Sequence, residues 1–145
     1  MVAFPVSCEE AYDYLVAPAN RAAWQSSLKG VADVMGEDGV VGQSWTDLTS
    51  AGVKPRMELT DADRPHRWSE RGTWRGFKAT LTLTFTPVFD DPTDPRPGPA
   101  TRCEVAASME VRGTGAIKPA GLVANRLAPI AVRSDLRRAA SILAG

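Results

Sequence analysis

The chain has 145 residues, which is most simply a single domain spanning 1–145. Its seventeen basic and seventeen acidic residues cancel, so no overall field attracts nucleic acid or an anionic membrane. No stretch approaches the roughly 18 apolar residues of a membrane span, and the first residues do not resemble a signal peptide. We therefore expect a cytoplasmic protein that binds no nucleic acid and does not insert stably into membranes, and we leave homodimer formation open.

Residues that bind metals or form disulfides are scarce. The only histidine is His66, and the only cysteines are Cys8 and Cys103, so a His/Cys metal site cannot be assembled and no disulfide framework is expected. This content favours a reducing cytoplasm, with no metal and no cofactor. His66 follows Pro65 at a predicted turn, where an exposed histidine is a simpler interpretation than a catalytic one.

Two short helices are predicted near the N-terminus. Ser7 and Glu10 form a capping box, in which the Ser7 hydroxyl accepts from the Glu10 amide and the Glu10 side chain reaches back. The helix that this box opens extends to about Val16. Pro18 ends it, and Asn20 can cap the second short helix.

Six strands are then predicted, separated by turn signals. The run from Phe77 to Thr86 is apolar at every odd position and Lys or Thr at every even one, and the run from Arg102 to Arg112 also places apolar residues at odd positions. Short connections make neighbouring strands antiparallel, and the longer segment Asp90–Ala100 is predicted to form an exposed hairpin tip. The four shorter strands are expected at Val31–Met35, Gln43–Thr49, Arg56–Asp61 and Arg67–Trp74.

A long helix is predicted to close the chain after Gly113–Gly115. Pro129 lies inside it and removes one backbone hydrogen bond, so a kink is expected there. Small residues before Pro129 suggest a half-helix that gates a cavity, and an immobile kinked helix is the alternative. The apolar positions that define the helix recur every three or four residues: Ala124, Ala128, Val132, Leu136, Ala139 and Leu143.

Several short motifs, in order along nearly the whole chain, resemble those of a known superfamily. They are Ser7 to Leu15 followed by Asn20 and Trp24, the turn from Gly42 to Trp45, Met57-Glu58-Leu59 before Arg64-Pro65, Trp68, Phe85-Thr86-Pro87, and Asp135-Leu136. The pattern resembles the START-related SRPBCC superfamily, which includes polyketide cyclase/dehydratase-like proteins.

The resemblance implies an α+β helix-grip fold, in which a curved antiparallel sheet wraps around a long C-terminal helix, with two short helices near the N-terminus. Members of this superfamily typically hold a hydrophobic molecule between the sheet and that helix. One departure is that only Met1 to Val6 are available for the first strand, so this strand is either short or truncated.

Strand parity proposes which residues line the cavity, because side chains two positions apart point the same way. For each residue, ordinary core packing is the alternative. The ligand-binding candidates are Trp45, Met57, Leu59, Trp68, Glu70, Trp74, Phe77, Leu81, Leu83, Phe85, Met109 and Val111 from the strands, and Ala124 and Ala128 from the helix.

Two of the residues on the inner face are carboxylates, Glu70 and Asp47. Burial in an apolar pocket would raise the pKa of such a group, which makes both residues candidates for a general acid or a ligand anchor. The alternative is exposure through a parity slip, or a structural ion pair with an arginine such as Arg56, Arg71 or Arg112.

Three functions follow from this sequence. The first is binding of a small hydrophobic ligand, which is lipid-, aromatic- or polyketide-like. The second is an enzyme, a polyketide cyclase, aromatase or dehydratase that uses a pocket carboxyl as general acid or base. The third is a protein interaction module with a filled core, which would use the basic face from Arg133 to Arg138.

Overall fold

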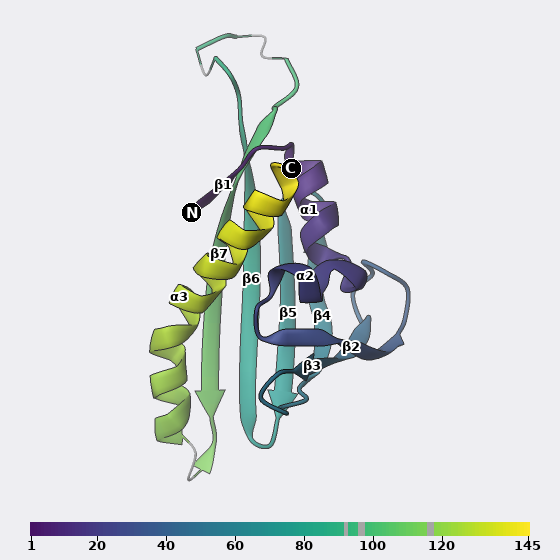
Figure 1. Ribbon diagram of the computed structural model, residues 1–145, viewed down its shortest axis with the longest axis vertical. Coiled ribbons are helices and arrows are strands. Elements are labelled where there is room, and N and C mark those ends of the chain that lie inside the picture. Colours follow the sequence, from purple (N-terminus) through teal and green to yellow (C-terminus); the bar gives the residue numbers. More distant parts are fainter. Residues whose placement is uncertain (92, 96–97, 116–117) are drawn as a thin grey trace.

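The computed structural model describes residues 1–91, 93–95, 98–115 and 118–145, with side chains in the last helix from residue 130 onward. Its seven strands form one antiparallel sheet in the order β1-β7-β6-β5-β4-β3-β2, and the helices lie across one face of it (Figure 1). This is the helix-grip fold that the sequence predicts. The strands are β1 (Val2–Phe4), β2 (Leu28–Met35), β3 (Ser44–Thr49), β4 (Arg56–Asp63), β5 (Arg67–Trp74), β6 (Phe77–Val88) and β7 (Arg102–Gly113), and the helices are α1 (Cys8–Val16), α2 (Arg21–Trp24) and α3 (Lys118–Leu143).

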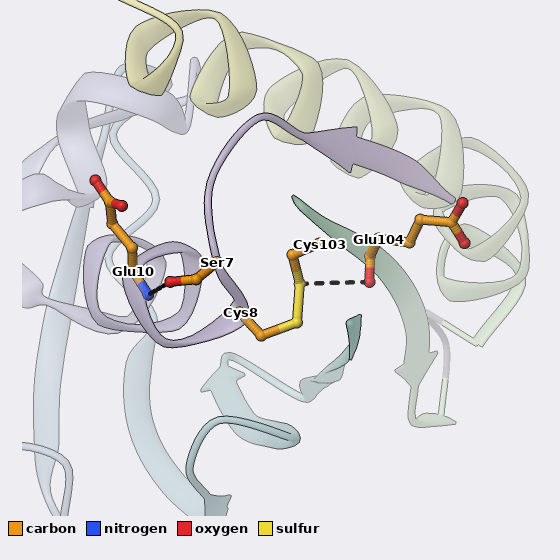
Figure 2. Close-up of a disulfide and its surroundings, with 5 residues drawn as sticks. All are labelled: Ser7, Cys8, Glu10, Cys103 and Glu104. Atoms are coloured by element: carbon orange, nitrogen blue, oxygen red, sulfur yellow. Dashed lines mark hydrogen bonds between the residues drawn. A yellow bond between two sulfur atoms is a disulfide. The ribbon is translucent and has the colours of Figure 1, made fainter. Parts of the chain in front are cut away.

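The start of α1 has the predicted Ser7 cap, although among the described residues the Glu10 side chain makes no bond back to Ser7, and the start of α2 lacks its predicted cap. Ser7 Oγ accepts a hydrogen bond from the Glu10 amide at 3.2 Å, as expected of a helix N-cap (Figure 2). Before α2, a single 3₁₀ turn occupies Pro18–Asn20, and the Asn20 side chain does not cap α2. Instead its amide donates to the backbone carbonyl of Tyr14 at 3.2 Å, which fastens the link between the two helices to the end of α1.

The two long strands pair along their whole length, from Phe77 opposite Gly113 to Val88 opposite Arg102. The two-residue turn between β5 and β6 consists of Arg75 at φ 43° and Gly76 at φ 82°. Positive φ at both positions characterises the turns that match the twist of paired strands, so this hairpin is tight. It sets the register that carries the odd positions of β6 to the helix-covered face.

The first strand is the short one that the sequence left open. Val2, Ala3 and Phe4 pair with Val105, Glu104 and Cys103 at the edge of β7, which gives seven strands where the repeating pattern predicted six. Val2 and Phe4 are buried and belong to the core, whereas Ala3 between them is exposed. Three residues therefore suffice to complete the sheet beneath the end of α3.

The closed part of the core lies where α1 and the last turns of α3 cover the sheet. Tyr12 of α1 packs its ring edge-on against Trp68, at 6.3 Å between centroids, and at a tilt against Phe85, at 5.1 Å. Leu83 and Leu136 are each 1% exposed and belong to the same core cluster. Burial of Leu81, Leu83 and Phe85 confirms the parity that was predicted for β6.

The cysteines depart from the sequence prediction. Cys8 at the start of α1 and Cys103 on β7 form a disulfide, with their Cα atoms 5.0 Å apart (Figure 2). Two cysteines were too few for a framework, but one bridge needs only that the ends of two elements meet. Because disulfides are typical of oxidising compartments, the cysteine content gives no support to the cytoplasmic prediction. Among the described residues, no helix is long and apolar enough to cross a membrane.

The last helix, α3, extends from Lys118 to Leu143 and lies diagonally over the sheet (Figure 1). Leu136 and Ala139 are buried against the core, which agrees with the predicted apolar repeat. Ala124, Ala128 and the predicted kink and gate around Pro129 lie outside the part of α3 whose side chains are described.

Candidate functional site

A cavity of about 470 Å³ lies between the sheet and α3, beside α2. Its volume falls in the range of small-molecule sites. Most of its wall is apolar and comes from the inner faces of β4 to β7, with Val132 contributed by α3. The cavity is partly open to solvent.

One end of the cavity is polar and is organised by Arg21 of α2. The Arg21 guanidinium donates to both oxygens of Glu70 on β5, from Nη1 at 2.7 Å and from Nη2 at 2.9 Å. Trp68 Nε1 donates to the same carboxylate at 3.2 Å. Both residues of the pair are 2% exposed, so this is a buried, bidentate ion pair that joins α2 to the middle of the sheet.

The second buried carboxylate, Asp47 of β3, is bound less completely. Its Oδ1 accepts a hydrogen bond from Trp45 Nε1 at 3.0 Å. Its Oδ2 lies 3.7 Å from Arg21 Nη2, which is an ion pair but is longer than a hydrogen bond. The Asp47 side chain is 8% exposed and lines the cavity. Glu70 therefore accepts three hydrogen bonds, whereas Asp47 accepts one and keeps more acceptor capacity at the cavity wall.

Two more polar residues border this end. Gln25, one turn after Arg21, accepts from Arg21 Nη2 at 3.3 Å through its side-chain oxygen. Asp135 of α3 accepts from the backbone amide and the hydroxyl of Ser26, at 3.2 and 2.8 Å. Because Ser26 lies two residues after the end of α2, the Asp135 contact holds α3 against α2 at the edge of the cavity.

Burial and neighbouring charges shift the pKa values of Arg21 and Asp47 in opposite directions. Burial alone would lower the pKa of Arg21, but the charge and hydrogen bonds of Glu70 outweigh it, and the pKa lies above the ordinary value. Burial also raises the pKa of Asp47, and the nearby Arg21 only partly offsets this. Arg21 is thus a permanent cation, and burial makes the charged form of Asp47 costly.

Two buried N–H groups have no hydrogen-bond partner among the described residues, namely Arg21 Nε and Trp24 Nε1. Both residues line the cavity, but these two atoms are themselves fully buried. Within the described part of the chain, no three or more His, Cys, Asp or Glu side chains are grouped to hold a metal ion.

Comparison with known proteins agrees with this architecture. The model of the polyketide cyclase / dehydrase and lipid transport family matches residues 2–145. The chain belongs to this family. It is thereby a member of the SRPBCC superfamily, as its motifs predicted. No curated protein matches the sequence.

Solved structures show the same fold at low sequence identity. XoxI from Bacillus cereus aligns with a TM-score of 0.70 at 8% identity, over 99% of this chain and 92% of that one. Protein MLL2253 from Mesorhizobium loti aligns with a TM-score of 0.67 at 14% identity, over 99% and 94%. Bacillus halodurans protein BH1534 aligns with a TM-score of 0.64 at 15% identity, over 98% and 92%.

The structure divides the predicted ligand-binding residues into two groups. Those along the cavity are Met57, Glu70, Trp74, Phe77, Leu81, Met109 and Val111. Those packed in the closed core, away from the cavity wall, are Trp45, Leu59, Trp68, Leu83 and Phe85. All of these residues point to the same face of the sheet, which strand parity predicted correctly. The position of the helices above that face decides which of them border the cavity.

The arginine that pairs with Glu70 is not among those considered from the sequence. Arg71 pairs with Glu58 at 3.0 Å, Arg112 pairs with Glu110, and Arg56 donates to a backbone carbonyl of β2. Arg71 follows Glu70 directly and therefore points to the opposite face of the sheet. The actual partner comes from a helix 49 residues earlier in the chain.

Sequence reasoning also missed Gln25 and Asp135 as members of the site. One signal was available for α2, because Arg21, Trp24 and Gln25 are three and four positions apart and so share one face of a helix. A buried helix face that carries an arginine needs an acidic partner. The predicted strands offered two inward carboxylates.

Replacing Glu70 with glutamine should be strongly destabilising, because it leaves Arg21 buried without a full counter-charge. We expect a loss of about 3–5 kcal/mol in the free energy of unfolding, measured by urea denaturation. The matched control is Glu110→Gln, an exposed position on β7, where the change should stay within about 0.5 kcal/mol. Equal losses in the two variants would contradict a buried ion pair.

The raised pKa of Asp47 predicts a pH-dependent effect of Asp47→Asn. Above the ordinary value of 3.8, the unfolded chain loses the Asp47 proton while the folded protein still holds it, so Asp47 stabilises less as pH rises. The variant does not titrate there. Its stability relative to wild type should therefore increase from pH below 3.8 to neutral pH. A difference that stays constant with pH would contradict the desolvation of Asp47.

Two neighbouring leucines on β6 should differ in their response to truncation. Leu83→Ala opens a sealed space in the core and should cost about 2–5 kcal/mol. Leu81→Ala removes a side chain that borders the existing cavity, so it should cost clearly less. Denaturant midpoints of both variants measure the difference, and equal costs would mean that Leu81 is packed as tightly as Leu83.

Proposed function

We propose that this protein binds a small hydrophobic ligand, which is lipid-, aromatic- or polyketide-like, in the cavity between the sheet and α3. The observation that carries the proposal is a cavity of about 470 Å³ with an apolar wall and one polar end. An apolar ligand that covers this wall removes apolar surface from water, which stabilises the complex by roughly 25 cal/mol per Å². The description of the family, which names cyclisation, dehydration and lipid transport, supports ligands of this class.

The cavity also bears on the two alternative functions. A protein interaction module with a filled core does not require an open apolar space beside α2. A cyclase or dehydratase remains the second candidate, and one observation favours it: Asp47 is a shielded carboxyl with a raised pKa at the wall. Oxyanion donors would also be needed, but the Arg21 Nη atoms are bound to Glu70 and the two unpartnered N–H groups are buried. Binding is therefore the function that the geometry supports best.

Filling the cavity should weaken binding. Ala79 lies on β6 at the cavity wall, and Ala79→Phe would place a ring in the space that the ligand needs. We expect affinity for Nile red, a neutral apolar dye whose fluorescence rises in apolar surroundings, to fall at least about tenfold, or 1.4 kcal/mol. Fluorescence titration measures this, and native mass spectrometry of the wild-type protein tests for a copurified molecule.

The matched control is Ala106→Phe, which makes the same substitution on β7 at a position outside the cavity and on the opposite face of the sheet. Its affinity for the dye should stay close to that of wild type. Loss of binding in both variants would point to unfolding, which denaturation curves detect. Unchanged binding in Ala79→Phe, or no binding by wild type, would overturn the proposed function.

A further inference from the structure

The polar end of the cavity holds more negative than positive side chains. Among the lining residues whose side chains are described, Arg21 is the one cation, whereas Asp47, Glu70 and Asp135 are carboxylates. Two hydrogen bonds commit Arg21 to Glu70, so these two charges cancel locally. Asp135 is held by Ser26, which is neutral. The remaining charge of the described side chains at this end is therefore negative.

Asp47 is the residue through which this charge meets the cavity. Its side chain is more than nine-tenths buried, and its Oδ2 accepts no hydrogen bond from the described residues. A carboxylate in that position has lost most of its hydration and has regained one hydrogen bond and a 3.7 Å ion pair in return. A ligand group that donates hydrogen bonds and carries positive charge would supply what is missing.

We propose that the ligand of this protein carries an ammonium group, which binds Asp47 while the apolar body of the ligand fills the cavity. This inference rests on the proposed function and specifies the class of ligand. An ammonium group has three N–H donors and no acceptor, so it complements a carboxylate oxygen that lacks a donor. The pair forms in a mostly apolar cavity, where charge attraction is stronger than in water.

The same arrangement disfavours a ligand carboxylate, such as that of a fatty acid. Both Nη atoms of Arg21 are occupied by Glu70, and its Nε is fully buried together with Trp24 Nε1. Among the residues whose side chains are described, a carboxylate at this end would thus meet Asp47 without an available cation. Like charges at close range in an apolar site are costly, so the cavity discriminates by charge as well as by shape.

The experiment compares three probes of eight carbon atoms each: octylamine, octanol and octanoate. Isothermal titration calorimetry at neutral pH and low salt gives the dissociation constant of each probe with the full chain. We expect octylamine to bind at least about tenfold more tightly than octanol, and octanoate to bind most weakly. Tighter binding of octanoate would overturn the inference, because it would place a ligand carboxylate against Arg21.

Asp47→Asn tests whether this one carboxylate is responsible. The variant keeps the size of the side chain, so octanol should bind as it does to wild type, whereas the preference for octylamine should disappear. The control is Asp63→Asn, an exposed position on β4 outside the cavity, which should keep the full preference. A preference that survives Asp47→Asn would also overturn the inference.

Failure of this inference is distinguishable from failure of the proposed function. If wild type binds Nile red and the three probes equally, the cavity binds apolar ligands but does not select an ammonium group, and only the inference falls. If wild type binds neither the dye nor any probe, the proposed function falls with it.

Discussion

Arg21 reaches from the short helix α2 to β5, where its guanidinium forms two hydrogen bonds with Glu70 in the interior of the protein. The remaining parts of the site take their positions from this contact. It fixes α2 over the middle strands of the sheet, and Asp135 of α3 then binds Ser26 just beyond α2. The ion pair therefore joins α2 to the sheet, and the Asp135 contact joins α3 to the segment that follows α2.

A buried ion pair is an expensive way to join two elements, because each charge must leave water before the pair can form. An apolar contact between α2 and the sheet would often be equally stable. A long arginine side chain nevertheless spans a distance that leucine or valine cannot, so it can hold a helix on the sheet without filling the space beside it. The ion pair thus lets the cavity stay open next to a well-packed core that contains Tyr12, Trp68 and Phe85.

How much of this structure could be predicted from the sequence depended on the range of the interaction. Alternation along β6 and β7 is a local property, and it correctly identified the inner face because each side chain direction follows from its neighbours. The pairing of Arg21 with Glu70 joins residues 49 apart, and the bond between Cys8 and Cys103 joins residues 95 apart. No local pattern encodes such contacts. Parity also could not separate Leu81 at the cavity from Leu83 in the core, because that difference is set by where the helices lie above the sheet.

Asp47 is a charged residue at a position on the inner face of the sheet where an apolar side chain is the rule. Strand parity places it on the inner face beside Trp45, where an apolar residue would be expected, and the structure keeps it there with a hydrogen bond from that tryptophan. Glu70 breaks the same rule but is fully compensated by Arg21 and Trp68. An ionisable group that is costly to bury and only partly compensated contributes little to stability at neutral pH. Such departures from a consistent fold are typical of functional positions. The incomplete compensation of Asp47, at the wall of an apolar cavity, therefore indicates where a ligand would make its polar contact.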